Sequence, residues 1–135
     1  MVGKVVDLSW LTADLVSQLH DEIIADSGGS PGIRDPGGLQ AALARPANIQ
    51  AYKETDDPVA LASALSCSIV ARHPFVDGNK RTAFACLMMF LGMYGLRLTM
   101  SETNAYELFV GLAEGSAAED DVVEAVRWAI DDKTL

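Results

Sequence analysis

The chain has 135 residues, half of them hydrophobic, which is enough for one hydrophobic core and too few for two ordinary domains. Its formal net charge is -9, from 10 lysines and arginines against 19 aspartates and glutamates, and this argues against direct binding to a nucleic-acid backbone. No run of about 18 apolar residues is present, and the first residues lack the pattern of a secretory signal. We therefore expect a single-domain cytoplasmic protein with no membrane contact, whose Cys67 and Cys86 are buried, reduced thiols.

The N-terminal part of the chain predicts a helix followed by a glycine-rich loop. Val5 and Val6 suit a short extended entry, and apolar residues at helical spacing predict a helix over 12–25. The residues from Ser27 to Gly32 are nearly all turn formers and predict a surface loop that continues to Pro36. A loop of this kind, at about 28–37, can act as a flap over a site.

Two further helices are predicted before the middle of the chain. A short helix over 39–44 is expected to stop near Pro46, because proline disrupts a helix interior. Asp57 and Pro58 then form an N-cap and a first-turn proline, so the next helix starts near Pro58. It runs to about Arg72.

The C-terminal half also reads as helical. The segment 80–94 is apolar on nearly every face, which predicts a helix surrounded by others in the core of the fold, with Gly95 as its C-terminal cap. Residues 96–99 are expected to be extended, and a helix follows over about 101–113. Residues 116–119 match a capping box at the start of the last helix.

Nine residues between the two central helices collect reactive groups: His73-Pro-Phe-Val-Asp-Gly-Asn-Lys-Arg81. Pro74 disfavours a helical conformation at His73, so the imidazole should lie at a helix end and face the loop. A neutral imidazole there can accept a proton from a hydroxyl group. The alternative is a histidine that only caps the helix end.

The rest of this segment has the groups that bind phosphate. Asp77 can hold a magnesium ion that bridges nucleotide phosphates, or it can simply form a turn or cap. Gly78 allows close backbone approach, and Asn79 can cap the following helix and donate to phosphate oxygens. Lys80 and Arg81 are cations at a helix N-terminus, where the helix dipole disfavours them, so they indicate an anionic ligand rather than a solvated charge pair.

These nine residues resemble the H-x-F-x-[DE]-[AG]-N-[GK]-R motif of the Fic/Doc superfamily and match every fixed position. Residues 32–46 are similar to a G-x-R-D-x-G-x-L-x-x-A-L-x-R-P stretch of the Doc, or death-on-curing, toxins. The resemblance implies an all-α single compact domain over 1–135, in which the motif loop 73–81 joins two central helices. It also implies that Arg34 and Asp35 on the flap dock the target.

The resemblance further implies a chemistry. Adenylylating Fic enzymes usually have glycine in place of Lys80 and a second arginine in place of Phe84, so both departures favour a Doc-type kinase. ATP would be the co-substrate with Mg²⁺ at Asp77, and the γ-phosphate would pass to a serine or threonine hydroxyl of elongation factor Tu, arresting translation. The implied catalytic residues are His73, Lys80 and Arg81, and the implied phosphate-binding residues are Gly78, Asn79, Lys80 and Arg81.

Other interpretations stay open. The chain could be a Fic-type adenylyltransferase that transfers AMP, or a catalytically silent module that helps an antitoxin repress its promoter. The resemblance implies a cognate antitoxin as partner, through which any DNA contact would be indirect. The self-inhibitory motif [ST]-x-x-x-E-[GN] is not matched. His20 is interpreted as a surface or structural residue, and Trp10 and Trp128 as core or docking residues.

Overall fold

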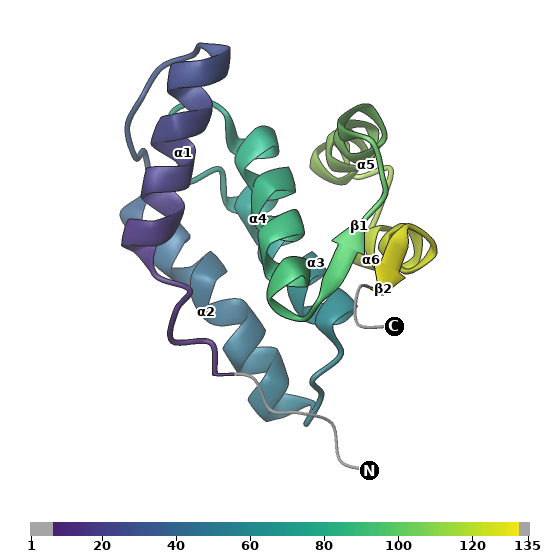
Figure 1. Ribbon diagram of the computed structural model, residues 1–135. Coiled ribbons are helices and arrows are strands. Elements are labelled where there is room, and N and C mark those ends of the chain that lie inside the picture. Colours follow the sequence, from purple (N-terminus) through teal and green to yellow (C-terminus); the bar gives the residue numbers. More distant parts are fainter. Residues whose placement is uncertain (1–6, 133–135) are drawn as a thin grey trace.

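The computed structural model describes residues 7–132, which form six helices and a two-stranded antiparallel sheet (Figure 1). The helices are α1 (Ala13–Ser27), α2 (Pro36–Tyr52), α3 (Pro58–Arg72), α4 (Asn79–Met93), α5 (Glu102–Glu114) and α6 (Glu119–Trp128). The strands are β1 (Leu96–Leu98) and β2 (Ile130–Asp132). This architecture confirms the all-α prediction, while the extended entry predicted at Val5 and Val6 lies outside the described residues. None of the described helices is both long and apolar enough to cross a membrane.

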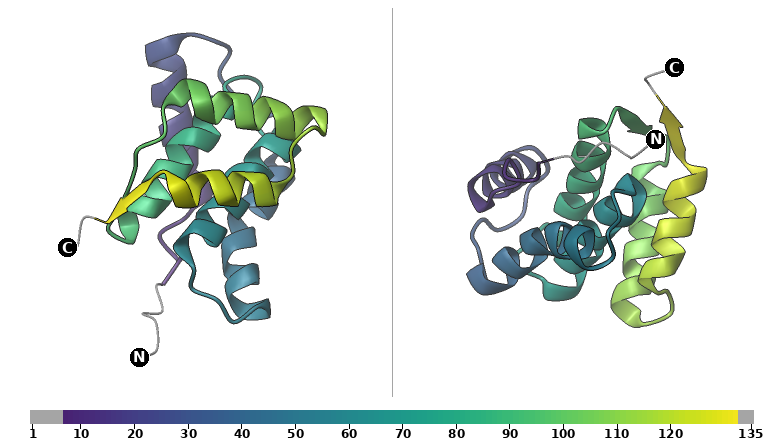
Figure 2. Two further views of the ribbon diagram at one scale, coloured as in Figure 1. Left: turned by 90° about the vertical axis from the view of Figure 1, so that its right-hand side faces the viewer. Right: turned by 90° about the horizontal axis from the view of Figure 1, so that it is seen from below.

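Helix α3 lies at the centre of the molecule. It packs most extensively against α2 and α4 and also contacts α5 and α6, while α1 and α2 lie on the opposite side from α5 and α6 (Figures 1 and 2). Every residue from Leu61 to Val70 is buried, because alanine, serine and cysteine let neighbouring helices approach on all faces. The prediction that 80–94 is a helix of the core is confirmed, since Phe84, Leu87, Phe90 and Leu91 of α4 are buried. Helix α4 packs beside α3 but leaves Met88 and Met93 exposed.

Most helix ends form where local signals predicted them. Thr12 accepts a hydrogen bond from the Leu15 amide at 3.2 Å, and Ser101 accepts one from the Asn104 amide at 3.1 Å. Asp57 caps α3 through the Val59 amide at 3.1 Å, with Pro58 as its first residue. Gly95 follows α4 with a φ of 78°, a conformation that glycine adopts without strain.

Pro46 does not stop α2, so the prediction of a helix ending there is wrong. Asp35 caps the helix by accepting from the Gly38 amide at 2.9 Å, and the helix runs for 17 residues through Pro46 to Tyr52. Proline removes one backbone hydrogen bond and disfavours the helix by roughly 3 kcal/mol. Pro46 is buried in the interface of α2 with the core, and this packing offsets the penalty.

The start of α6 also differs from the prediction. Its N-cap is Ala118, whose amide donates to the Asp121 carboxylate at 2.7 Å, whereas the predicted cap Ser116 donates instead to the Gly111 carbonyl at 3.3 Å. Glu119, the acidic member of the predicted capping box, forms a bidentate ion pair with Arg45 of α2. Because the Glu119 carboxylate binds Arg45, it does not cap the N-terminus of α6.

The predicted extended segment at 96–99 is confirmed as β1, but the sequence did not indicate its partner. Leu96 lies opposite Asp132 and Leu98 opposite Ile130, and Arg97 pairs with Asp131 at 2.7 Å. The pairing brings the end of α4 beside the end of α6.

Candidate functional site

The motif loop joins the C-terminus of α3 to the N-terminus of α4, as predicted. His73 is the C-cap of α3 and has a left-handed main chain, with φ 52° and ψ 55°. Its amide still donates to the Ile69 carbonyl at 3.0 Å, so the helix ends at this residue. The imidazole is exposed and makes no hydrogen bond with the described residues, which leaves it free to act on a ligand.

A cavity of about 300 Å³ opens directly over this loop. It brings together the predicted site residues of the motif, and its lining is His73, Asp77, Gly78, Asn79, Lys80, Arg81 and Tyr106. Tyr106 was not predicted from the sequence, since no motif connects it to a loop that ends 25 residues earlier. Burial and then the nearby Glu102 carboxylate raise the pKa of the Tyr106 phenol to about 12, so the phenol stays a hydrogen-bond donor.

Asp77 presents its carboxylate at the cavity. One oxygen accepts from the Gly78 amide at 3.0 Å and the other from the Ser30 amide at 3.2 Å, which leaves lone pairs on both. The described residues contain no group of three histidines, cysteines or acids that could hold a metal by themselves. One carboxylate beside a phosphate-sized cavity fits Mg²⁺, which is often held by one or two carboxylates together with substrate phosphates and waters.

Asn79 does not cap α4, so that part of the prediction is wrong. Its side chain closes on the main chain of Phe75, donating to the carbonyl at 2.9 Å and accepting from the amide at 2.9 Å. The N-cap is Gly78, with a φ of 75° and no side-chain cap. The amide of Asn79 therefore holds the loop in shape, and its phosphate-binding role stays a prediction.

Lys80 and Arg81 form no ion pair with the described residues, and the first turn of α4 contains no acidic side chain. The first amides of a helix also have no acceptor inside the helix. Two cations and a set of free amides thus face the same cavity. This end of α4 suits an anion.

His20 of α1 supports the loop from beneath. The ring is 1% exposed, stacks on Phe75 with centroids 3.9 Å apart, and places Nε2 2.8 Å from the Asp77 carbonyl. A carbonyl can only accept, so Nε2 donates. The structural interpretation of His20 is confirmed, but its partner, 57 residues away, had no signal in the sequence.

The flap lies against the motif loop. An isolated β-bridge pairs Ile33 with Phe75, and the Val76 amide donates to the Gly32 carbonyl at 3.0 Å. Asp35 caps α2, while the Arg34 guanidinium donates to main-chain carbonyls at the end of α3. Both side chains therefore have partners within the chain, and their assignment to target docking stays a prediction.

A second cavity, of about 330 Å³, shares Arg81 with the first. Its apolar lining includes Ile23, Phe84 and Met88, and Phe84 is largely buried there. An aromatic ring thus occupies the position at which adenylylating Fic enzymes have a second arginine. Among the described lining residues, Arg81 is the only one with a guanidinium that could bind a phosphate.

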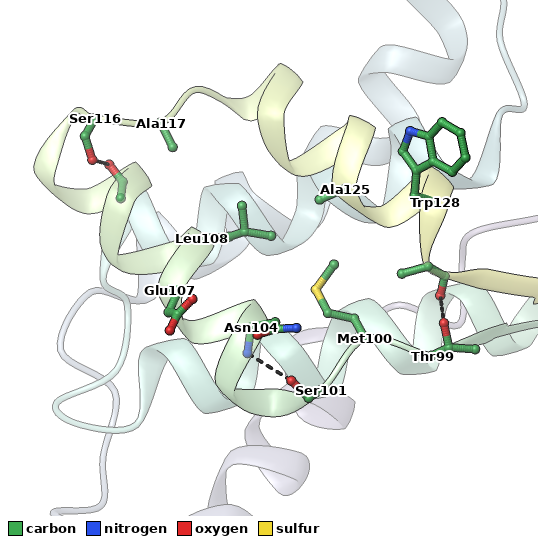
Figure 3. Close-up of a pocket in the computed structure, with 12 residues that line it drawn as sticks. Thr99, Met100, Ser101, Asn104, Glu107, Leu108, Ser116, Ala117, Ala125 and Trp128 are labelled. Atoms are coloured by element: carbon green, nitrogen blue, oxygen red, sulfur yellow. Dashed lines mark hydrogen bonds between the residues drawn. The ribbon is translucent and has the colours of Figure 1, made fainter.

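Another cavity, of about 770 Å³, lies between α5 and α6 and contains none of the predicted site residues (Figure 3). Glu107 is its one ionisable lining residue among those described, so it offers no cation to a phosphate. Trp128 stands at its edge and is 86% exposed, which excludes the core position considered for it. Trp10 instead packs on Phe90, with ring centroids 5.8 Å apart.

The motif loop ends one central helix and opens the next, and it brings an exposed imidazole into one cavity with two cations that have no ion-pair partner among residues 7–132. These features define a mainly helical protein with a site for an anionic ligand. Comparison with known proteins agrees: the model of the Fic/DOC family matches residues 10–91. The chain is 34% identical over 109 residues to the protein kinase doc of Escherichia phage P1, covering 81% of this chain and 86% of that protein. It is 43% identical over 75 residues to the toxin Doc of Mycolicibacterium smegmatis, covering 53% and 55% of the two chains. The chain belongs to the Fic/DOC family, which confirms the resemblance seen in the motif.

Proposed function

We propose that the chain is the toxin of a toxin–antitoxin pair and transfers the γ-phosphate of ATP to a serine or threonine hydroxyl of a target protein. The observation that carries this proposal is the cavity in which His73 lies with Asp77, Lys80 and Arg81. The names of the relatives, a protein kinase and a toxin, support a phosphotransferase that acts as a toxin. Elongation factor Tu is the proposed target, and arrest of translation the proposed effect.

His73 is the proposed general base. Its unpaired imidazole takes the proton of the target hydroxyl as that oxygen forms a bond to the γ-phosphorus. The bond between the γ-phosphorus and the β,γ-bridging oxygen breaks, and ADP leaves with the bond's electron pair. The exposed position of the imidazole at the cavity allows a protein substrate to reach it.

Lys80, Arg81 and the first amides of α4 stabilise the negative charge on the transferring and leaving phosphates. Phosphoryl transfer depends chiefly on positioning and charge stabilisation, so a site built from one loop and one helix end is sufficient. Asp77 is the residue that would hold Mg²⁺, which supplies further charge neutralisation on the phosphates when bound.

Two residues favour phosphate over AMP as the transferred group. Lys80 stands where a glycine would let the backbone approach a diphosphate closely, and it adds a mobile charge instead. Phe84 replaces a guanidinium with a ring. Transfer of AMP is the alternative outcome of the test below.

The test uses two labels. The protein is incubated with elongation factor Tu and Mg²⁺ and with ATP labelled at either the γ- or the α-phosphate. We expect target label from the γ position only, and none with His73→Ala. Arg81→Ala should reduce labelling strongly, whereas Arg97→Ala, which removes an exposed cation in β1, should not. Label from the α position alone would mean adenylylation.

The proposed partner is an antitoxin that neutralises the chain, and any contact with promoter DNA would come through it. Expression of the chain alone in a bacterium should arrest growth, and co-expression with the antitoxin should restore it. The His73→Ala variant should be harmless. If neither the wild-type chain nor the His73→Ala variant affected growth, the proposal of a toxin would lose its main support. Binding of ATP without transfer of phosphate to any protein would favour a silent antitoxin-binding module.

A further inference from the structure

We infer that Arg34 of the flap is a positioning residue for His73, which rests on the proposed role of His73 as general base. Three consecutive carbonyls at the end of α3 accept hydrogen bonds from this one residue. The guanidinium Nη2 donates to the Arg72 carbonyl and Nε to the His73 carbonyl, each at 2.8 Å. The Arg34 main-chain amide donates to the Pro74 carbonyl at 2.7 Å.

These carbonyls are groups that need a partner. The last four carbonyls of a helix have no donor within it, and the C-terminus bears partial negative charge. A guanidinium is a planar fork with several donors, so it binds two adjacent carbonyls in one orientation, which a lysine ammonium cannot reproduce. The arginine therefore completes the end of α3 from 38 positions away.

The main chain that Arg34 holds is an unusual one. Among the described non-glycine residues, only His73 and Glu54 have positive φ, and the left-handed region is disfavoured for any residue with a Cβ atom. Pro74 disfavours the alternative right-handed helical conformation at His73. Because φ and ψ of His73 set the direction of its Cα–Cβ bond, the hydrogen bonds from Arg34 set where the imidazole points.

The competing interpretation is that Arg34 docks the target protein. Arg34 is exposed, so its location is compatible with both target docking and positioning of His73. Kinetic measurements distinguish the two roles. Loss of a docking residue raises KM for the target and leaves the chemical step intact. Loss of a positioning residue lowers kcat, because a misplaced general base acts poorly on every bound substrate.

The test compares Arg34→Ala and Arg34→Lys with Arg97→Ala as a matched surface control. We expect kcat for phosphate transfer to fall roughly 100-fold in Arg34→Ala, with KM for the target and ATP affinity by calorimetry unchanged. Arg34→Lys should recover only part of the rate, and added guanidinium ions should partly rescue Arg34→Ala but not Arg34→Lys. A rise in KM for the target at unchanged kcat would overturn the inference.

A second measurement is independent of activity. In the NMR spectrum of the free protein, a strong intraresidue NOE between the His73 amide and Hα protons reports positive φ. We expect this NOE in the wild type and in Arg97→Ala, and its weakening in Arg34→Ala in an otherwise folded spectrum. An unchanged NOE in Arg34→Ala would overturn the inference. If wild type transferred no phosphate, the proposed function would fail while this measurement still decided whether Arg34 holds His73.

Discussion

His20 shows how a residue outside the motif sets the geometry of the site. Its Nε2 donates to the carbonyl of Asp77, and its ring stacks on Phe75, so α1 holds both ends of the turn that presents the carboxylate. The imidazole of His20 is buried and is therefore unavailable to substrate. Its contribution lies in the position of Asp77.

His20→Leu should lower the free energy of unfolding by about 1–3 kcal/mol, because the Asp77 carbonyl loses its buried donor. His20→Gln keeps an amide donor at a similar distance and should lose less. Urea denaturation followed by circular dichroism measures both variants. Equal losses would mean that the ring stack, which both variants remove, is the part that matters.

Removal of the Lys80 charge should reduce the rate of phosphate transfer without reducing the stability of the fold. Its side chain makes no ion pair with the described residues, so Lys80→Ala should leave stability almost unchanged. Phosphate transfer should fall roughly 100-fold, as expected for loss of a donor to the transition state. The matched control is Lys53→Ala at the exposed end of α2. Similar rates in the two variants would exclude Lys80 from the reaction.

At the scale of elements, the sequence predicted those helix ends that are determined by contacts between residues close together in the chain. Thr12, Asp57, Ser101 and Gly95 mark helix ends in the structure because each acts on amides or carbonyls a few residues away. The same holds for the motif loop, because six of its nine residues line one cavity together with Tyr106.

Apart from Asn79, whose side chain bonds to nearby Phe75 instead of capping α4, the misses depend on contacts between distant segments. Burial of Pro46 keeps α2 intact, and the pairing of Arg45 with Glu119 moves the start of α6. The partners of the motif loop, His20 and Arg34, come from α1 and the flap and have no periodic pattern that identifies them. Tyr106 reaches the cavity only because α5 packs against α4.

The junction between α3 and α6 provides a prediction about pH. Asp57 caps α3 and also pairs with Arg127 in the last turn of α6. Burial alone would raise the pKa of the Asp57 carboxyl, but the hydrogen bond and charge of Arg127, with the Val59 and Ala60 amides, hold it below its ordinary value of 3.8. A lowered pKa means that the folded state binds the proton more weakly than the unfolded state. This stabilisation is complete above the ordinary pKa and is lost as pH falls through the lower, folded value.

Asp57→Asn should therefore lower the free energy of unfolding at pH 7 by about 0.5–1 kcal/mol, since asparagine keeps the cap but loses the ion pair. The difference from wild type should start to shrink below about pH 4 and continue to shrink as pH falls through the lower, folded pKa, where the wild-type carboxyl also becomes neutral. Asp131→Asn is the control, because the pair of Asp131 with Arg97 is more exposed. A difference that stayed constant from pH 7 to pH 3 would contradict the assignment.

At the scale of the whole molecule, the site is attached to its most buried part. The motif loop connects α3 to α4, and these two helices pack against each other along the core. The flap and α1 hold the loop from one side, while α5 contributes Tyr106 from the other. His73 and Arg81 are exposed and Lys80 is half-buried, but the main chain that bears them is anchored to the core.

Cys67 in α3 and Cys86 in α4 can report whether this pair of helices opens as a unit. Both thiols are buried and free, and burial raises the pKa of each to about 12, with the Glu119 charge also acting on Cys67. At pH 8 only about one thiol in ten thousand is then a thiolate, so neither should react with a thiol reagent in the native state. With increasing urea, both should become reactive at the concentration at which the helical signal is lost. The variants Cys67→Ala and Cys86→Ala isolate each thiol, and reaction of either one before the loss of helix would show that α3 and α4 separate locally.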